Sequence, residues 1–195
     1  MGVVSLSVYG QSVQPFYVDK DVVFKPELVG KWGFGSDSAF EFRDVGDNLY
    51  GIDLKDLGSV MHFRGRLIHL GRHFFLDVQI SGFEGPETTE KRTEKVQIGS
   101  VTNGGFKLDR EDIFLNRHHG LILLEFTKNR DEFIGHVWKD SWLPEVAEKK
   151  KLTCPYVRDE LGRILLTGDR LQLRKFAEGL PLDAFGEPHV LSRDS

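Results

Sequence analysis

An alternation of apolar and polar residues with a period of two runs through the first two thirds of the chain. Over residues 40–54, apolar side chains at every second position flank a polar turn at residues 46–48. Because successive side chains of a strand point to opposite faces, this pattern predicts a β-hairpin with one apolar face. The same reasoning predicts a second hairpin over residues 61–80, with its turn at residues 71–72.

Further strands are predicted on both sides of these hairpins. A strand is expected to begin at Leu28 and to carry a buried Trp32, and two more hairpins are expected over residues 96–108 and 121–138. Residues 81–95 are polar, charged and interrupted by Gly and Pro, which indicates a long surface loop. A meander of about eight or nine short strands avoids exposed edges by closing into a barrel, with an open sandwich as the alternative.

The last third of the chain changes to a helical pattern. A short helix is expected over residues 141–150, capped by its first residue, Ser141. After a short strand over residues 164–166, Thr167 is expected to cap a second helix with one apolar face. The remaining residues, 181–195, contain Gly and Pro and are expected to be an irregular tail.

Composition supports a single folded domain. The chain has 195 residues, of which 39% are hydrophobic and 29% charged, so it can bury one core and is not compositionally disordered. Most of its aromatic residues are Phe, which favours half-buried pleated surfaces. We therefore predict a mainly β (α+β) protein, an antiparallel meander closing into a lipocalin-like barrel, with two short C-terminal helices. This domain is expected over residues 22–180, after an extended segment at residues 1–21.

Charge and cysteine content exclude several classes of protein. The net charge is −4 with acidic and basic residues mixed, so no basic stripe exists and nucleic acid is not expected as a partner. No stretch approaches the roughly 18 to 20 apolar residues that span a bilayer. Cys154 is the only cysteine, so no intrachain disulfide can form. Residues 1–10 are apolar but follow no Lys or Arg, which fits an export-signal remnant, an N-terminal strand or a vector-derived leader.

No constellation of residues indicates catalysis. Cys154 has no activating neighbour, and the acidic residues occupy outward strand positions or loops, as on a solvated face. The sequence contains no P-loop, dinucleotide or hydrolase motif. Six histidines come closest to a metal site, but their spacing matches no standard motif. They are His62, His69, His73, His118, His119 and His136. We expect a non-enzymatic protein that uses no metal or cofactor.

The apolar inner face of the predicted barrel is the strongest candidate for a function. A small barrel can enclose one small hydrophobic ligand, which would contact the inward-facing side chains. The predicted ligand-binding residues are Trp32, Phe40, Phe42, Tyr50, Ile52, Phe63, Phe74 and Leu76. The alternative is a filled barrel, in which case the protein is a protein–protein interaction or structural module. An enzyme is the third hypothesis.

Several short segments resemble one kind of known protein. They are L-V-G-K-W (28–32), H-F-F-L-D-V (73–78), H-H-G-L-I-L-L (118–124), D-S-W-L (140–143) and I-L-L-T-G (164–168). Together they resemble uncharacterised bacterial lipoprotein-type proteins with a lipocalin-like (calycin) barrel, and Gly30-x-Trp32 is similar to the short signature of the first lipocalin strand. The resemblance implies a place in the cell envelope or periplasm, with the cytoplasm as the alternative. Such lipoproteins carry a cysteine after a short apolar run, whereas this chain has Val8-Tyr9-Gly10-Gln11 there.

Overall fold

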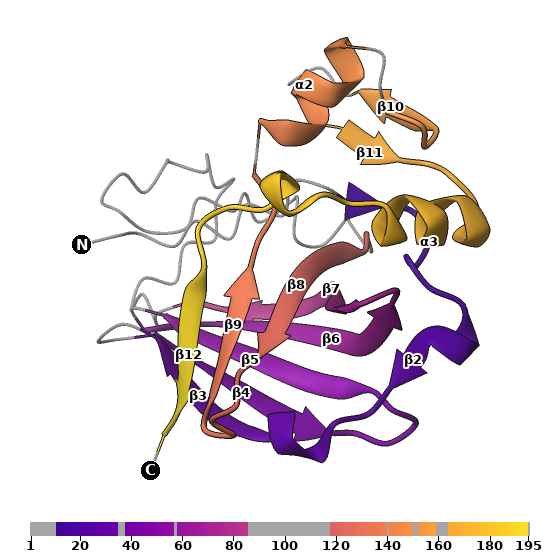
Figure 1. The fold of residues 1–195 in the computed structure, drawn as a ribbon. Coiled ribbons are helices and arrows are strands. Elements are labelled where there is room, and N and C mark those ends of the chain that lie inside the picture. The colour runs from indigo at the N-terminus through magenta and orange to yellow at the C-terminus, as the bar shows by residue number, and fades with distance from the viewer. Residues whose placement is uncertain are drawn as a thin grey trace, which may run out of the picture.

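The computed structural model describes residues 11–34, 38–56, 58–85, 118–139, 141–149, 152–158 and 164–194. Its centre is a closed barrel of eight antiparallel strands (Figure 1). They are β3 (Gly30–Phe34), β4 (Ser38–Asp44), β5 (Tyr50–Asp56), β6 (Ser59–Leu70), β7 (His73–Glu84), β8 (Gly120–Phe126), β9 (Glu132–His136) and β12 (His189–Arg193). Their order is β6-β5-β4-β3-β12-β9-β8-β7, and β7 pairs again with β6. The predicted closure of the meander into a barrel is confirmed.

The hairpins predicted from the period of two are confirmed where the structure describes them. In the β4–β5 hairpin, Phe42 pairs with Ile52, and the turn places Gly46, Asp47 and Asn48 at φ values of 86°, 52° and 56°. Gly and Asn tolerate this left-handed backbone best, which is why a polar Gly-Asp-Asn turn interrupts the apolar alternation. The β6–β7 and β8–β9 hairpins also lie where predicted, whereas the hairpin predicted over residues 96–108 lies outside the described residues.

Two predicted strand boundaries are wrong. Leu28 belongs to a short 3-10 helix, η2 (Pro26–Leu28), and the strand that carries Trp32 begins at Gly30. Strand β7 continues through Glu84 instead of ending before residue 81, because β6 offers it a pairing partner along its whole length. The pairing register of β6 and β7 shifts between His62 and Phe63. This irregularity lets the polar end of β7 remain paired with β6.

The C-terminal segment is the largest correction. Residues 181–195 were expected to be irregular, but they contain η3 (Leu182–Ala184) and strand β12, which lies between β9 and β3. Four residues of β12 pair with β9, two pair with β3, and Leu191 is buried inside the barrel. Without β12 the barrel would have two open edges. The barrel therefore does not end at residue 180.

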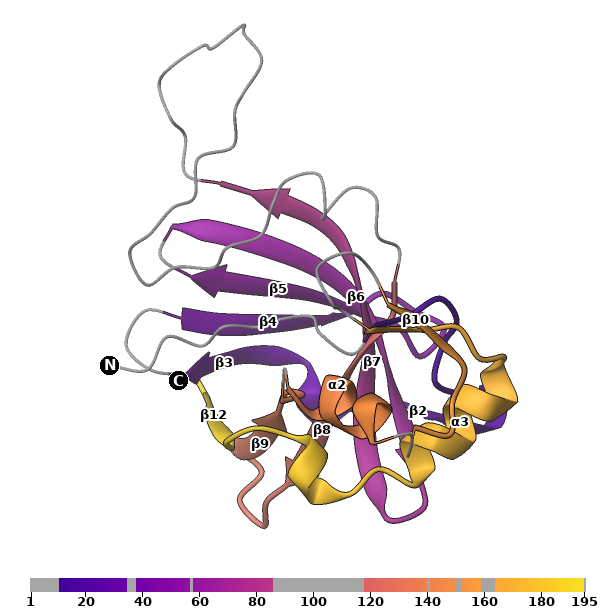
Figure 2. The same ribbon diagram turned by 90° about the horizontal axis from the view of Figure 1, so that it is seen from above.

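A second layer covers the outer face of β6, β7 and β8. It consists of helices α2 (Trp142–Glu148) and α3 (Arg170–Glu178) and a small sheet of β1 (Gln11–Ser12), β11 (Ile164–Leu166) and β10 (Tyr156–Arg158). The helices lie on the side of β8, away from β4 and β5 (Figure 2). Outward-facing Phe75 and Leu123 pack there with Leu173 and Ala177 of α3, which makes a second hydrophobic core outside the barrel. None of the described helices has the length and apolar character needed to cross a bilayer.

The two predicted helices exist, and Ser141 is the N-cap residue of α2 as predicted, but the predicted cap of α3 is wrong. The N-cap of α3 is Asp169 rather than Thr167: Asp169 Oδ1 accepts hydrogen bonds of 2.9 Å from the amides of Leu171 and Gln172. The Thr167 amide instead donates to the carbonyl of Pro155 at 2.8 Å, as part of the small sheet region. Ser141 stands at the N-cap of α2 without a side-chain cap bond, because its backbone is already helical.

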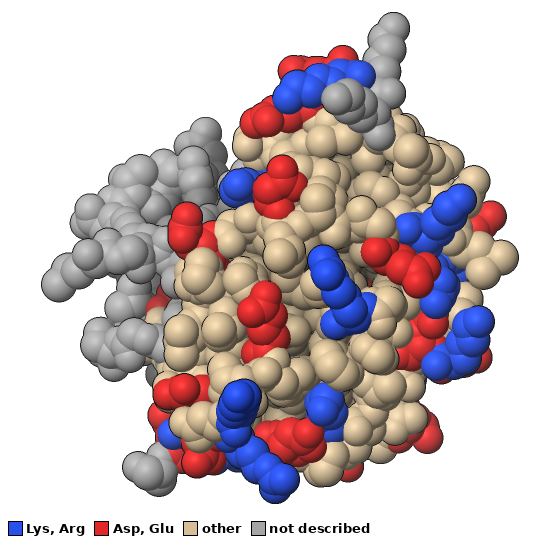
Figure 3. Space-filling view, viewed as in Figure 1, with Lys and Arg blue, Asp and Glu red and all other residues tan. Residues whose placement is uncertain are grey.

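The described part of the N-terminal segment belongs to the fold. Phe16 is fully buried in the second core, and β2 (Val22–Val23) pairs with β6. Asp21, in η1 (Asp19–Asp21), accepts two hydrogen bonds from Arg174 of α3 at 2.8 and 3.0 Å. On the face drawn in Figure 3, basic and acidic side chains are interspersed rather than gathered by sign.

Candidate functional site

The two ends of the barrel differ. One end is crossed by residues 24–29, which lead from β2 to β3 and include η2; we call this segment the strap and this end the strap end. At the other end, which we call the far end, β4 and β6 begin while β5 and β7 finish. The inner face between the two ends is one hydrophobic cluster.

Aromatic side chains fill the strap end. The Trp32 indole meets Phe133 edge to face with ring centroids 4.7 Å apart, and its Nε1 donates to the carbonyl of Leu28 at 2.7 Å. The Tyr50 hydroxyl donates to the carbonyl of Lys25 at 3.1 Å and accepts from the Lys25 amide at 2.8 Å. Burial raises the pKa of Tyr50 to about 12. These bonds hold the strap on the aromatic core.

The middle of the barrel is equally tight around Gly65, the partner of Tyr50 in the β5–β6 ladder. A Cβ atom at this position would lie 3.0 Å from Ile52 Cδ1 and 3.1 Å from Val78 Cγ1. Both distances are shorter than the ordinary separation of packed carbon atoms. Glycine is therefore the residue that lets the neighbouring side chains meet here.

Both ends of the inner face carry partly buried apolar side chains, among them Phe74 and Phe126 at the strap end. One row of inward-facing neighbours runs across five strands as Trp32, Phe40, Leu54, Met61 and Phe83, and Ile80 belongs to the next row. Its members from Phe40 to Phe83 lie toward the far end. Leu54 and Met61 are buried, whereas Phe40, Ile80 and Phe83 are only partly buried. The inner face thus presents apolar surface at the far end.

The predicted ligand-binding residues all belong to the inner cluster, but the structure does not bring them to one place. Six of them are buried in it: Trp32, Phe42, Tyr50, Ile52, Phe63 and Leu76. Phe40 and Phe63 lie toward the far end, whereas Phe74 lies at the strap end, where the Lys25 ammonium is 5.1 Å from its ring centroid. That these residues bind a ligand remains a prediction.

Three acidic residues that were predicted to be solvated, Asp21, Asp53 and Asp77, are buried instead, and Asp77 on the outer face of β7 is the most buried of them. It is 3% exposed, accepts a 3.0 Å hydrogen bond from the Phe16 amide, and lies 2.6 Å from Nδ1 of His119. Burial raises the pKa of Asp77, and these two partners offset the rise only in part. The sequence carried a signal: Phe75 follows Phe74, so β7 is apolar on both faces, which indicates that both are covered.

Asp53 is another of these buried acids, on the outer face of β5. Arg43 of β4 donates to both of its carboxylate oxygens, and His62 of β6 places Nδ1 2.7 Å from Oδ1. The Arg43 hydrogen bonds, assisted by His62, lower the pKa of Asp53 to about 2. The three side chains tie neighbouring strands together across a face that no described helix covers.

This cluster predicts a stability difference that depends on pH. The folded-state pKa of Asp53 lies below its ordinary value of 3.8, so its contribution is present above about pH 4 and is lost as pH falls toward 2. The Arg43→Gln variant should therefore be less stable at pH 7 by about 1 kcal/mol, a figure kept small because the Arg43 side chain is 48% exposed. Urea unfolding at pH 7 and pH 2.5 should show this deficit shrinking in acid. Arg64→Gln, on the same face, is the control, and an equal deficit at both pH values would contradict the assignment.

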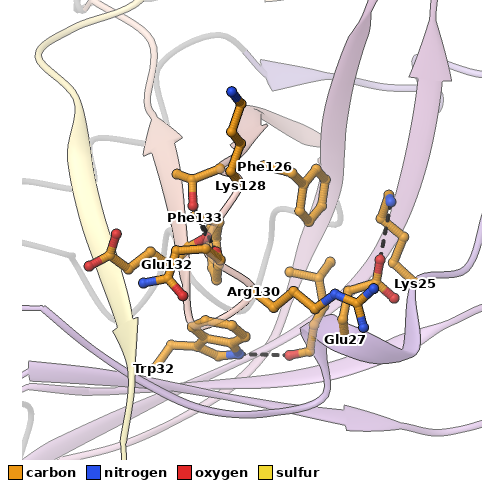
Figure 4. Close-up of a pocket in the computed structure, with 11 residues that line it drawn as sticks. Lys25, Glu27, Trp32, Phe126, Lys128, Arg130, Glu132 and Phe133 are labelled. Atoms are coloured by element: carbon orange, nitrogen blue, oxygen red, sulfur yellow. Dashed lines mark hydrogen bonds and ion pairs between the residues drawn. The ribbon is translucent and has the colours of Figure 1, made fainter.

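A separate pocket of about 230 Å³ lies beside the strap (Figure 4). Its apolar walls include Leu28, Trp32 and Phe126. Charged side chains complete it; they are Lys25 and Glu27 from the strap and Lys128, Arg130 and Glu132 from the β8–β9 connection and β9. Sequence reasoning missed this site because its charged residues lie in two turns about a hundred positions apart.

The remaining histidines and the cysteine of the described ranges lie in pairs or alone. Within the described ranges, no three His, Cys, Asp or Glu residues come together as metal ligands. His62 and His119 each face a carboxylate, and His118 Nδ1 lies 2.9 Å from Gln11 Oε1. Cys154 is buried in the second core, and burial raises the pKa of its thiol. A raised pKa disfavours the reactive thiolate.

Fold and site together define a class: an eight-stranded antiparallel β-barrel with a packed strap end, an apolar far end, and short helices on its outer side. No protein-family model, curated protein or solved structure matches the chain. The class therefore rests on strand pairing and packing alone.

Proposed function

We propose that this protein is a non-enzymatic barrel that binds a small hydrophobic molecule at the far end of its inner face. The observation that carries the proposal is the partial exposure of the inward-facing side chains Phe40, Ile80 and Phe83, at the end of the inner face that the strap does not cross. Apolar surface that is left accessible inside a barrel gains free energy when an apolar molecule covers it, at roughly 25 cal/mol per Å².

The packing limits where such a ligand can lie. Tyr50 and Trp32 are buried against the strap, and the tight contacts around Gly65 leave no space for a ligand in the middle. A ligand would therefore rest on the outermost row, against Phe83 and Met61, which neighbour each other across β6 and β7. This is a shallower and smaller site than the eight-residue cavity predicted from the sequence.

The proposal predicts saturable binding of an uncharged apolar dye. Nile red should bind the wild-type protein with an increase in fluorescence, and dodecanol should displace it. Phe83→Ala should weaken the binding about tenfold, because a buried Phe side chain contributes about 1.5–3 kcal/mol. Phe74→Ala, which removes an inner-face ring at the strap end, should leave the affinity unchanged. Unsaturable binding, or equal losses in both variants, would refute a far-end site.

An interaction or structural module with a filled core is the second candidate. The packed strap end and the close contacts at Gly65 favour it. The same titration separates the two functions, because a module with a filled core binds neither Nile red nor dodecanol saturably.

The proposed place of action is the bacterial cell envelope, and it rests on the resemblance of the segments around Gly30-x-Trp32 to lipoprotein-type barrels. The position of Trp32 on the first strand of the barrel supports that resemblance. Fractionation of cells that express the natural gene should recover the protein with the envelope or periplasm; recovery in the cytoplasm alone would refute this assignment.

A further inference from the structure

The pocket beside the strap presents a different chemistry from the far end. Arg130 extends from the β8–β9 turn across the pocket toward Glu27, and Lys25 lies on the same side as Glu27 (Figure 4). Trp32 and Phe126 form apolar walls on opposite sides of this opening. A ligand here would meet charged groups and aromatic carbon together.

The backbone that carries these cations is fixed. Thr127 Oγ1 donates to the carbonyls of Asn129 and Glu132 at 2.7 and 3.0 Å, which closes the turn that holds Arg130. On the strap, the backbone of Lys25 is held by both hydrogen bonds of the Tyr50 hydroxyl. Groups held in place before binding lose less entropy when a ligand arrives.

The pocket already holds one carboxylate, that of Glu27. Its Oε1 lies 3.2 Å from the Lys25 ammonium, which also sits 4.6 Å from the ring centroid of Phe126. A backbone hydrogen bond, together with Lys25 and Arg130, lowers the pKa of Glu27. The Glu27 side chain is 45% exposed, so it can rotate toward solvent and leave the Lys25 ammonium free for another carboxylate.

Charge and size then restrict the ligand. Three basic and two acidic residues line the pocket, which leaves one excess positive charge. Among the described residues, Lys128 and Arg130 form no ion pair. The volume of about 230 Å³ is below the roughly 300–1,000 Å³ of sites for drug-sized ligands, so it suits a molecule of about one ring.

We propose that this pocket binds a small organic acid with an apolar body, such as a monocyclic aromatic carboxylate. The carboxylate would replace that of Glu27 between Lys25 and the planar guanidinium of Arg130, whose paired N–H groups match two carboxylate oxygens. The apolar body would lie against Trp32 and Phe126. This site is distinct from the far-end site, because Phe40, Met61, Ile80 and Phe83 do not line it, although Trp32 pairs with Phe40 in the β3–β4 ladder.

The test uses three probes on the full chain: benzoate, its neutral analogue benzamide, and acetate, which has the charge without the ring. Calorimetric titration should show saturable benzoate binding at least about tenfold tighter than that of the other two, since charged hydrogen bonds contribute about 1.5–3 kcal/mol. Benzoate should also shift the NMR signal of the Trp32 indole N–H and leave that of Trp142 in place.

Two variants give opposite predictions. Arg130→Gln should weaken benzoate binding about tenfold, whereas Glu27→Gln should strengthen it severalfold by removing the internal competitor. Arg72→Gln, in the exposed β6–β7 turn, should have no effect. Benzamide binding as tight as benzoate, acetate as tight as benzoate, or weaker benzoate binding in Glu27→Gln would each overturn the proposal. Phe83→Ala should leave benzoate affinity unchanged, so loss of the far-end site and loss of this one are distinguishable.

Discussion

Replacement of Trp32 by alanine is expected to lower the free energy of unfolding by about 3–5 kcal/mol. The indole is 2% exposed, packs on Phe133, and donates a hydrogen bond to the carbonyl of Leu28. The guanidinium of Arg193, on β12, lies 4.3 Å from the Trp32 ring centroid. Alanine would leave a cavity at the point where the strap, the first barrel strand and the last one meet. Urea unfolding followed by circular dichroism measures the loss.

Two further variants separate the parts of this effect. Trp32→Phe keeps a ring in the core but loses the bond to Leu28, so we expect a smaller loss of about 1–2 kcal/mol. Trp142→Ala removes an indole that is only partly buried on α2, and it should cost less than Trp32→Ala. A cost below about 1 kcal/mol for Trp32→Ala would mean that the strap end is not the packed region described above.

Substitution of Asp77 by alanine is the second large effect, with an expected loss of about 3–5 kcal/mol. The variant would leave the Phe16 amide without its buried acceptor and Nδ1 of His119 without its hydrogen-bond partner. Phe16 is fully buried, so water cannot replace the lost partner without disturbing the second core. Urea unfolding should show the loss, and hydrogen exchange at the Phe16 amide should become faster by a larger factor than at the barrel strands.

Asp77→Asn is the matched control, because its amide oxygen can still accept from the Phe16 amide. The raised pKa of Asp77 means that the fold favours the protonated acid: its contribution is complete below about pH 4 and is lost as pH rises through the folded-state pKa. Asn keeps the shape without the titration, so the variant should lack this decline. If Asp77→Asn were as unstable as Asp77→Ala at neutral pH, the negative charge rather than the acceptor would be the stabilising element.

The strands were predictable where the local pattern of apolar and polar residues matches the way the strand packs in the tertiary structure. In β4 and β5 one face is apolar and the turn carries Gly46, so the residues themselves define the hairpin and its register. Strand β12 shows the opposite case, because its five residues carry too short a pattern and follow the turn-forming Pro188. The N-cap of α3 is Asp169, two positions after the predicted Thr167. The exact first residue of a helix depends on where the preceding strand ends.

The candidate sites were less predictable than the strands. The alternation of apolar and polar residues identified the side chains of the inner face, but it did not show how deeply each is buried. Tyr50, which is buried, and Phe40, which is partly buried, therefore gave the same signal. The alternation also assigned Asp77 to solvent, because alternation reports the face of a strand and not what packs on that face. Lys25 and Arg130 line the same pocket because the barrel places the strap beside the β8–β9 turn, which the sequence pattern does not reveal.

The sequence by itself determined a mainly β chain, the hairpins on either side of Gly46 and Gly71, and the set of side chains that face inward. These features follow from interactions between near neighbours along the chain, and a short window of residues records them. Only the tertiary structure decided that β12 completes the barrel, that a second layer buries Asp77, and that the strap packs on Trp32 and Tyr50. Each depends on contacts between distant segments, whose free energy no local pattern contains.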